Sequence, residues 1–100
     1  MFFTKKQAYV MARRPLQLFI SRLSFYTTNE KLRALFSPFG ELKDARLLVD
    51  SKTRRPKGFG FVTFESETDA HNALKALNGK IIDGRMVFVE VAKTPGSGES

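Results

Sequence analysis

Apolar and polar residues alternate along four short stretches of the chain, and between them apolar residues recur at helical spacing. Alternation with a period of two is typical of half-buried strands, whereas spacings of three and four indicate amphipathic helices. The pattern predicts strands at 16–23, 42–49, 57–64 and 85–92, with one helix after the first strand and one after the third. The apolar faces of the second and last strands consist of Ala45, Leu47, Val49, Val87, Val89 and Val91.

Each predicted strand has one apolar face and each predicted helix one apolar stripe. Two helices covering one face of a four-stranded sheet give the smallest arrangement that buries them all. We therefore predict an α+β fold whose second sheet face is open.

Both predicted helices begin at a hydroxyl residue followed by an acid three positions later. The first begins at Thr27 and ends before Gly40, and the second begins at Ser66 and ends at an Asn-Gly pair. This spacing allows side chains to satisfy the free N–H groups of the first turn, and glycine favours the conformation that ends a helix. Phe25 and Tyr26 precede the first helix, so we expect them to pack in the loop or as a hydrophobic staple.

The third predicted strand, KGFGFVTF at 57–64, has aromatic residues on both faces. Alternation puts Val62 and Phe64 on one face, and Phe59 and Phe61 on the other together with Lys57. Since β-branched and large apolar residues favour the core, we predict that Phe59 and Phe61 lie on the open face. Exposed neighbouring rings indicate a surface that a flat ligand covers.

The octapeptide at 57–64 resembles the RNA recognition motif signature at every position. The hexapeptide LFISRL at 18–23 resembles the one that this family carries on its first strand. The resemblance covers residues 16–93 and implies a ferredoxin-like β-α-β-β-α-β order, an antiparallel sheet, and the first and third strands side by side at its centre. Arg22 stands where the family usually has Asn, from which we expect an altered turn or an added phosphate contact.

The resemblance also implies roles for the residues of the open face. Phe19 and Phe61 would each stack on a base of single-stranded RNA, and Phe59 would pack against the sugars between them. Lys57 would contact a phosphate. The positions that border the bound strand and set its sequence preference would be Arg46, Leu48, Met86, Phe88, Glu90, Ala92 and Lys93. The loop cations Lys52, Arg54 and Arg55 are candidate phosphate contacts, with a solvated turn as the alternative.

Charge and composition narrow the class of partner. Lys and Arg number 17 against 10 Asp and Glu, for a net charge of +7, which favours a polyanion such as nucleic acid or an anionic membrane. No apolar run approaches the length of a bilayer span. The chain has no cysteine and His71 is its single histidine, so we expect no metal site, and no cofactor is indicated.

The leading prediction is a non-catalytic, monomeric module that binds single-stranded RNA as an accessory factor in RNA processing, stability or editing. Single-stranded DNA and a protein partner are the alternative ligands. Small acyl phosphatases share a similar element order, but the chain lacks a phosphate-cradling loop, paired catalytic carboxylates and a nucleophile with its base. We therefore expect no enzyme and no catalytic residue.

The two ends differ from the predicted domain at 16–93. We expect residues 1–15, which contain no acid, to form a basic leader or arm, and residues 94–100 to form a flexible Gly/Ser tail. A basic, acid-free start resembles an organellar targeting segment and also a basic arm that touches nucleic acid. The whole chain resembles small single-domain RNA-binding proteins of plants, several of which work in chloroplasts or mitochondria. Those organelles are one predicted location, and the nucleus or cytoplasm is the alternative.

Overall fold

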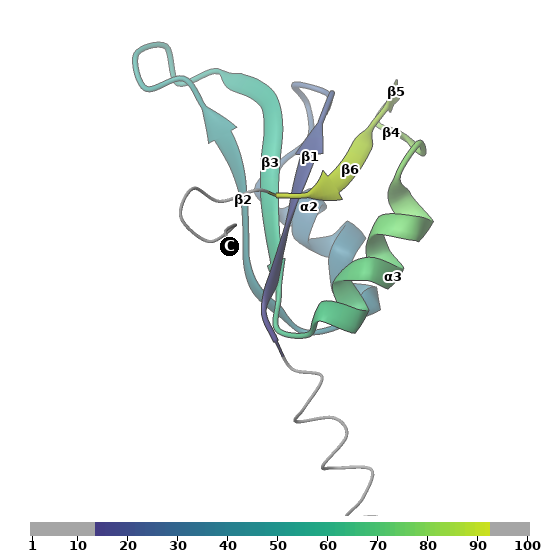
Figure 1. Cartoon of the computed structure of the whole chain (residues 1–100). Coiled ribbons are helices and arrows are strands. Elements are labelled where there is room, and N and C mark those ends of the chain that lie inside the picture. Colours follow the sequence, from purple (N-terminus) through teal and green to yellow (C-terminus); the bar gives the residue numbers. More distant parts are fainter. Residues whose placement is uncertain (1–13, 93–100) are drawn as a thin grey trace, which may run out of the picture.

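Two helices cover one face of a four-stranded sheet and leave the other face open (Figure 1). The computed structural model describes residues 14–92. The strands and helices, in chain order, are β1 (Leu16–Ser21), α2 (Asn29–Phe36), the 3-10 helix η1 (Ser37–Phe39), β2 (Leu42–Val49), β3 (Pro56–Phe64), α3 (Glu67–Leu77), β4 (Ile81–Ile82), β5 (Arg85–Met86) and β6 (Phe88–Val91).

The strand order in the main sheet is β2-β3-β1-β6, and every neighbouring pair is antiparallel. The predicted α+β class and antiparallel sheet are therefore confirmed, with β1 and β3 at the centre. β4 and β5 form a separate two-stranded hairpin beside the main sheet.

The core lies between the sheet and the helices. Leu18 and Ile20 on β1 and Val62 and Phe64 on β3 have no exposed surface. The rings of Phe64 and Phe36 meet edge to face, with centroids 6.3 Å apart. The predicted inward faces of the two central strands are thus correct, and burying these four residues on one side directs the alternate side chains to the other.

The first helix begins one residue later than predicted. The Thr28 hydroxyl accepts a hydrogen bond from the Lys31 N–H at 3.1 Å, so Thr28 and not Thr27 is the N-cap. Thr27 is buried and its hydroxyl donates to the Asp83 carboxylate at 2.8 Å. The second cap is as predicted, because the Ser66 hydroxyl accepts from the N–H three residues on. A local spacing rule cannot detect that a distant carboxylate competes for one of two adjacent threonines.

The last predicted strand, at 85–92, is divided in the structure. Its first two residues pair with Ile81–Ile82 in the hairpin, and only Phe88–Val91 joins the main sheet. The division falls at Val87, whose backbone N–H and C=O bond to Lys80 and Gly79. The prediction was wrong here because the pattern of alternation continues unchanged across a break in the backbone direction.

Two valines predicted to face the core lie at the ends of the outer strands. Val49 is 52% exposed and Val91 is 37% exposed. β2 and β6 are the edges of the sheet, and the β2 register shifts between Leu47 and Val49. The strand ends therefore extend beyond the surface that the helices cover. β1 also ends before the predicted residue 23, because Arg22 adopts φ 63 and leaves the strand direction.

Candidate nucleic-acid interface

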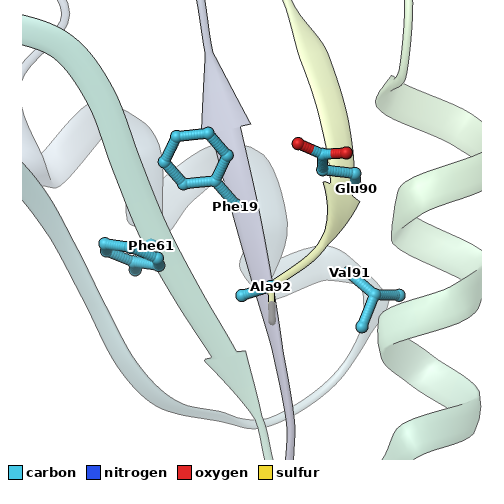
Figure 2. Close-up of a pocket in the computed structure, with 5 residues that line it drawn as sticks. All are labelled: Phe19, Phe61, Glu90, Val91 and Ala92. Carbon is cyan, nitrogen blue, oxygen red and sulfur yellow. The ribbon is translucent and has the colours of Figure 1, made fainter. Parts of the chain in front are cut away.

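One row of side chains crosses all four strands of the open face. Arg46 on β2 lies opposite Phe61 on β3, Phe61 opposite Phe19 on β1, and Phe19 opposite Glu90 on β6. Residues directly opposite one another in a sheet share a face, so this row runs from a cation across two rings to a carboxylate. Figure 2 shows the two rings and the Glu90 carboxylate on neighbouring strands.

The aromatic platform consists of Phe19, Phe59 and Phe61. The Phe19 ring stacks on Phe59 with 5.5 Å between centroids and an angle of 18°, and lies 5.3 Å from Phe61 at 50°. Phe59 is 38% exposed, and the other two rings are half-buried by their neighbours. The structure thus places the three predicted rings together on the open face, where a flat apolar ligand can reach them.

A hollow of about 440 Å³ lies beside this platform, between β1, β3 and the end of β6 (Figure 2). Its lining comprises Phe19, Phe61, Glu90, Val91 and Ala92. The Ala92 N–H donates to the Gln17 carbonyl at 2.9 Å, which fixes the chain at the end of β6. The hollow is of the size that accommodates a small organic group and combines two rings with one acceptor.

A second aromatic group borders the platform at β6. Phe88 lies across Ser21 from Phe59 and is 43% exposed. The Arg22 guanidinium lies 5.7 Å from the Phe88 ring centre, within cation–π range. Arg22 adopts a left-handed φ of 63°, a conformation that Asn adopts more readily than Arg. The altered turn or added phosphate contact expected from Arg22 stays a prediction.

Of the other residues that were predicted to border the bound strand, only some lie beside the aromatic platform in the structure. Arg46 forms an exposed ion pair with Asp44 at 3.4 Å. Leu48 is half-buried on β2. Met86 lies in the β4–β5 hairpin rather than on a strand of the main sheet, so its predicted place in that sheet was wrong. Lys93 lies outside the described residues.

The loop between β2 and β3 projects beyond the sheet and carries exposed Lys52, Arg54 and Arg55 (Figure 1). Asp50 closes it: its carboxylate accepts from the backbone N–H groups of Lys52 and Thr53 at 2.8 and 3.0 Å. These hydrogen bonds, the Thr53 one foremost, lower the pKa of Asp50. The Asp50 backbone also bonds to Arg54 and Arg55. The three cations are therefore held on an ordered turn.

Two glycines allow β3 to lie where it does. Gly58 has φ +84, and its carbonyl accepts from the Leu23 N–H at 2.9 Å. A Cβ on Gly60 would come within 3.1 Å of the Arg46 carbonyl and 3.3 Å of Leu32. Gly60 thus permits close packing beneath the platform, and Gly58 turns the strand near the exposed Lys57.

The packing predicted for Phe25 and Tyr26 was wrong. Phe25 is 62% exposed and Tyr26 is 89% exposed. Thr27, the residue that follows them, is drawn inward by its bond to Asp83, and the two rings project from the loop. The surface that these residues form was not foreseen.

Some predictions fall outside the described residues, and others concern absent features. Residues 1–13 and 93–100, which include nearly all of the leader and the tail, lie outside the described part. Within residues 14–92, no group of His, Cys, Asp and Glu is arranged to hold a metal ion. No helix there has the length and apolar character needed to cross a bilayer.

The four-stranded sheet with two helices and the ring-bearing open face are those of a nucleic-acid-binding domain. The RNA recognition motif model matches residues 18–87, and the chain belongs to this family. Family membership confirms the non-enzymatic prediction.

Plant relatives match nearly the whole domain. The chain is 49% identical over 78 residues to the chloroplastic Organelle RRM domain-containing protein 1 of Zea mays, covering 78% of this chain and 20% of that protein. It is 45% identical to the chloroplastic Organelle RRM domain-containing protein 6 of Arabidopsis thaliana, covering 78% and 43%. A Glycine-rich RNA-binding protein of Daucus carota is 39% identical, covering 88% and 56%. The chain thus spans from about a fifth to just over half of these relatives.

Solved structures agree with this assignment. The Sxl-lethal protein in its RNA complex superposes with a TM-score of 0.78 at 32% identity, over 84% of this chain and 50% of that one. RNA Binding Protein PG1 gives 0.76 at 32% identity, over 80% and 98%. The predicted β-α-β-β-α-β fold is confirmed.

Proposed function

We propose that the open face binds single-stranded RNA, with Phe19 and Phe61 each stacking on one base and Phe59 packing against the sugars between them. The observation that carries this proposal is the platform of three rings, with centroids 5.3 and 5.5 Å from Phe19. Unpaired bases present flat π-faces, and RNA recognition domains bind two or three of them in this way. The Sxl-lethal protein, a structural relative, is seen in complex with RNA, which supports the same ligand.

Exposed cations on two sides of the platform would bind phosphates. Lys57 is two residues from Phe59 on β3, and Arg46 lies opposite Phe61. The loop that Asp50 closes would add Lys52, Arg54 and Arg55. For Arg46, a phosphate must compete with the Asp44 carboxylate, which is 3.4 Å away. Lys57 and the loop cations meet no such competition in the described ion pairs.

Glu90 would contribute to base preference. Its carboxylate lines the hollow beside Phe19, and a carboxylate accepts hydrogen bonds but donates none. A base that presents an amino group there would bind, whereas a carbonyl oxygen in the same place would face an acceptor. Phe88 and Lys93 would border the same path of the RNA.

We infer an accessory role in RNA processing, stability or editing, performed by a monomer without catalysis of its own. One domain of this kind contacts few nucleotides, so its affinity is modest unless a linked segment or partner adds to it. The chloroplastic relatives support a role in an organelle.

The direct test compares one sequence as single-stranded RNA, single-stranded DNA and duplex RNA, measured by fluorescence anisotropy at a single salt concentration. We expect the single-stranded RNA to bind most tightly and the duplex to bind weakly, because paired bases cannot stack on the platform. Equal affinity for duplex and single strand would contradict the stacking geometry. Tighter binding of DNA would favour the alternative ligand.

The contribution of the cations should be measurable from how the affinity for RNA changes with salt concentration. Lys57→Ala or Arg55→Ala should reduce the slope of log K against log salt by about 0.7 for each phosphate of a single strand that the protein no longer neutralises. Lys75→Ala is the matched control, because Lys75 is exposed on α3, which packs on the opposite face of the sheet. An unchanged slope in Lys57→Ala would show that this ammonium binds no phosphate.

A further inference from the structure

A second hollow lies at the end of the sheet, outside the row that crosses the platform. It encloses about 230 Å³ and its lining includes the side chains of Arg22, Phe25, Lys57, Phe59 and Arg85. We call it the loop groove. Three of these side chains are cations and two are rings, and no carboxylate is among the described residues that line it. Its composition is that of a site for a flat anion.

Two separate segments form the walls of the loop groove and are joined by hydrogen bonds. Phe25 lies on the segment between β1 and α2, and Arg85 lies on β5. The Asp83 carboxylate accepts from the Thr27 hydroxyl at 2.8 Å and from the Lys31 ammonium at 3.2 Å. These two bonds, the Thr27 one foremost, lower the pKa of Asp83. The walls are therefore held together in the folded protein.

The floor of the groove is fixed as well. The Leu23 N–H donates to the Gly58 carbonyl at 2.9 Å, which ties the end of β1 to β3. The ring of Phe25 lies above Gly58, close to where a Cβ there would stand, at 3.6 Å. A side chain at Gly58 would thus intrude on the groove, which suits the glycine found there.

The three cations of the groove have no carboxylate partner among the described ion pairs, although Arg22 contacts the Phe88 ring and Phe59 stacks on Phe19. Arg22, Lys57 and Arg85 take part in none of the ion pairs found within residues 14–92. Phe25 is 62% exposed, although a ring of that size usually lies in a core or an interface. A nucleotide supplies both a base for the ring and a phosphate for the cations.

The loop groove is continuous with the platform through one shared ring. Phe59 stacks on Phe19 and also lines the groove. We propose that the loop groove binds one further nucleotide of the RNA strand as it leaves the sheet, an inference that rests on the proposed function. The base lies against Phe25, and its phosphate lies among Arg22, Lys57 and Arg85. The volume of the loop groove is below the range of about 300–1,000 Å³ that is typical of sites for drug-sized ligands. The groove therefore has room for one nucleotide only.

The test separates the groove from the platform by the length of the ligand. Random-sequence RNA trimers and octamers are titrated into the ¹⁵N-labelled chain of 100 residues, and dissociation constants are obtained from the amide shifts. Phe25→Ala should weaken octamer binding about fivefold or more, the lower end of the effect of removing a stacking ring, and leave trimer binding unchanged. The Leu23 and Gly58 amides of the wild type should shift with the octamer more than with the trimer.

Tyr26→Ala is the matched control, because Tyr26 is adjacent and 89% exposed but does not line the groove. It should bind both lengths as the wild type does. If Phe25→Ala binds the octamer as tightly as the wild type while Phe19→Ala does not, the groove is unused and the platform stands. If neither variant loses affinity, the proposed function fails together with the groove. An equal loss in Tyr26→Ala would also overturn the assignment of the effect to the groove.

Discussion

Replacing Phe19 and Phe61 together by alanine should weaken binding of single-stranded RNA by about 1–3 kcal/mol for each ring, the range measured for stacked bases. Each ring is half-buried on the open face, and each lies in the row between Arg46 and Glu90. Both side chains lie opposite the core, so the fold should survive their loss. The dissociation constant measures the effect, and far-UV circular dichroism monitors the fold.

The conservative variants Phe19→Tyr and Phe61→Tyr keep a flat ring at each position. They should retain most of the affinity, because stacking depends on the π-face that phenylalanine and tyrosine share. A folded alanine double variant that binds RNA like the wild type would remove stacking as the mechanism. Loss of binding in the tyrosine variants as well would point to a packing role for these rings.

Phe64→Ala should lower the free energy of unfolding by about 3–5 kcal/mol, the usual cost of a buried phenylalanine. Phe64 has no exposed surface, lies opposite Leu16 and Leu42 on the adjacent strands, and packs on Phe36. Because domains of this size have only about 5–15 kcal/mol of stability, the loss should be plain in a urea denaturation curve.

Phe59→Ala is the internal control, since Phe59 lies on the same strand and faces the opposite way. Its loss removes a stacked pair of about 0.5–1.5 kcal/mol and leaves no cavity in the core. Equal destabilisation by the two substitutions would contradict the division of β3 into a core face and a ligand face.

The fold could be predicted from the sequence because the alternation within β3 indicates which residues face the core and which face the open side of the sheet. Because Val62 and Phe64 are buried in the core, alternation along the strand puts Phe59 and Phe61 on the open face, which is where they lie in the structure. The same alternation on β1 located Phe19. The helices followed from their apolar spacing, and the error in the first one was a single residue.

The errors arose where distant segments meet. Nothing local distinguishes Thr27 from Thr28 as a cap until Asp83, 56 residues away, accepts a hydrogen bond from Thr27. The hairpin at 81–86 was hidden because its second strand continues the alternation of β6. Phe25 resembled a core residue by type, and only the placement of Arg85 beside it defines the loop groove. Its one sequence signal was an aromatic pair directly before a helix cap.

The turn closed by Asp50 determines whether the β2–β3 loop loses its conformational entropy on folding or on binding a ligand. Four hydrogen bonds between residues 50 and 55 join backbone groups to one another or to the Asp50 carboxylate within the folded chain. The loop is thus preorganised, and its ordering entropy is lost on folding rather than on association. Its cations therefore hold fixed positions, and form a region of positive potential, before a polyanion binds.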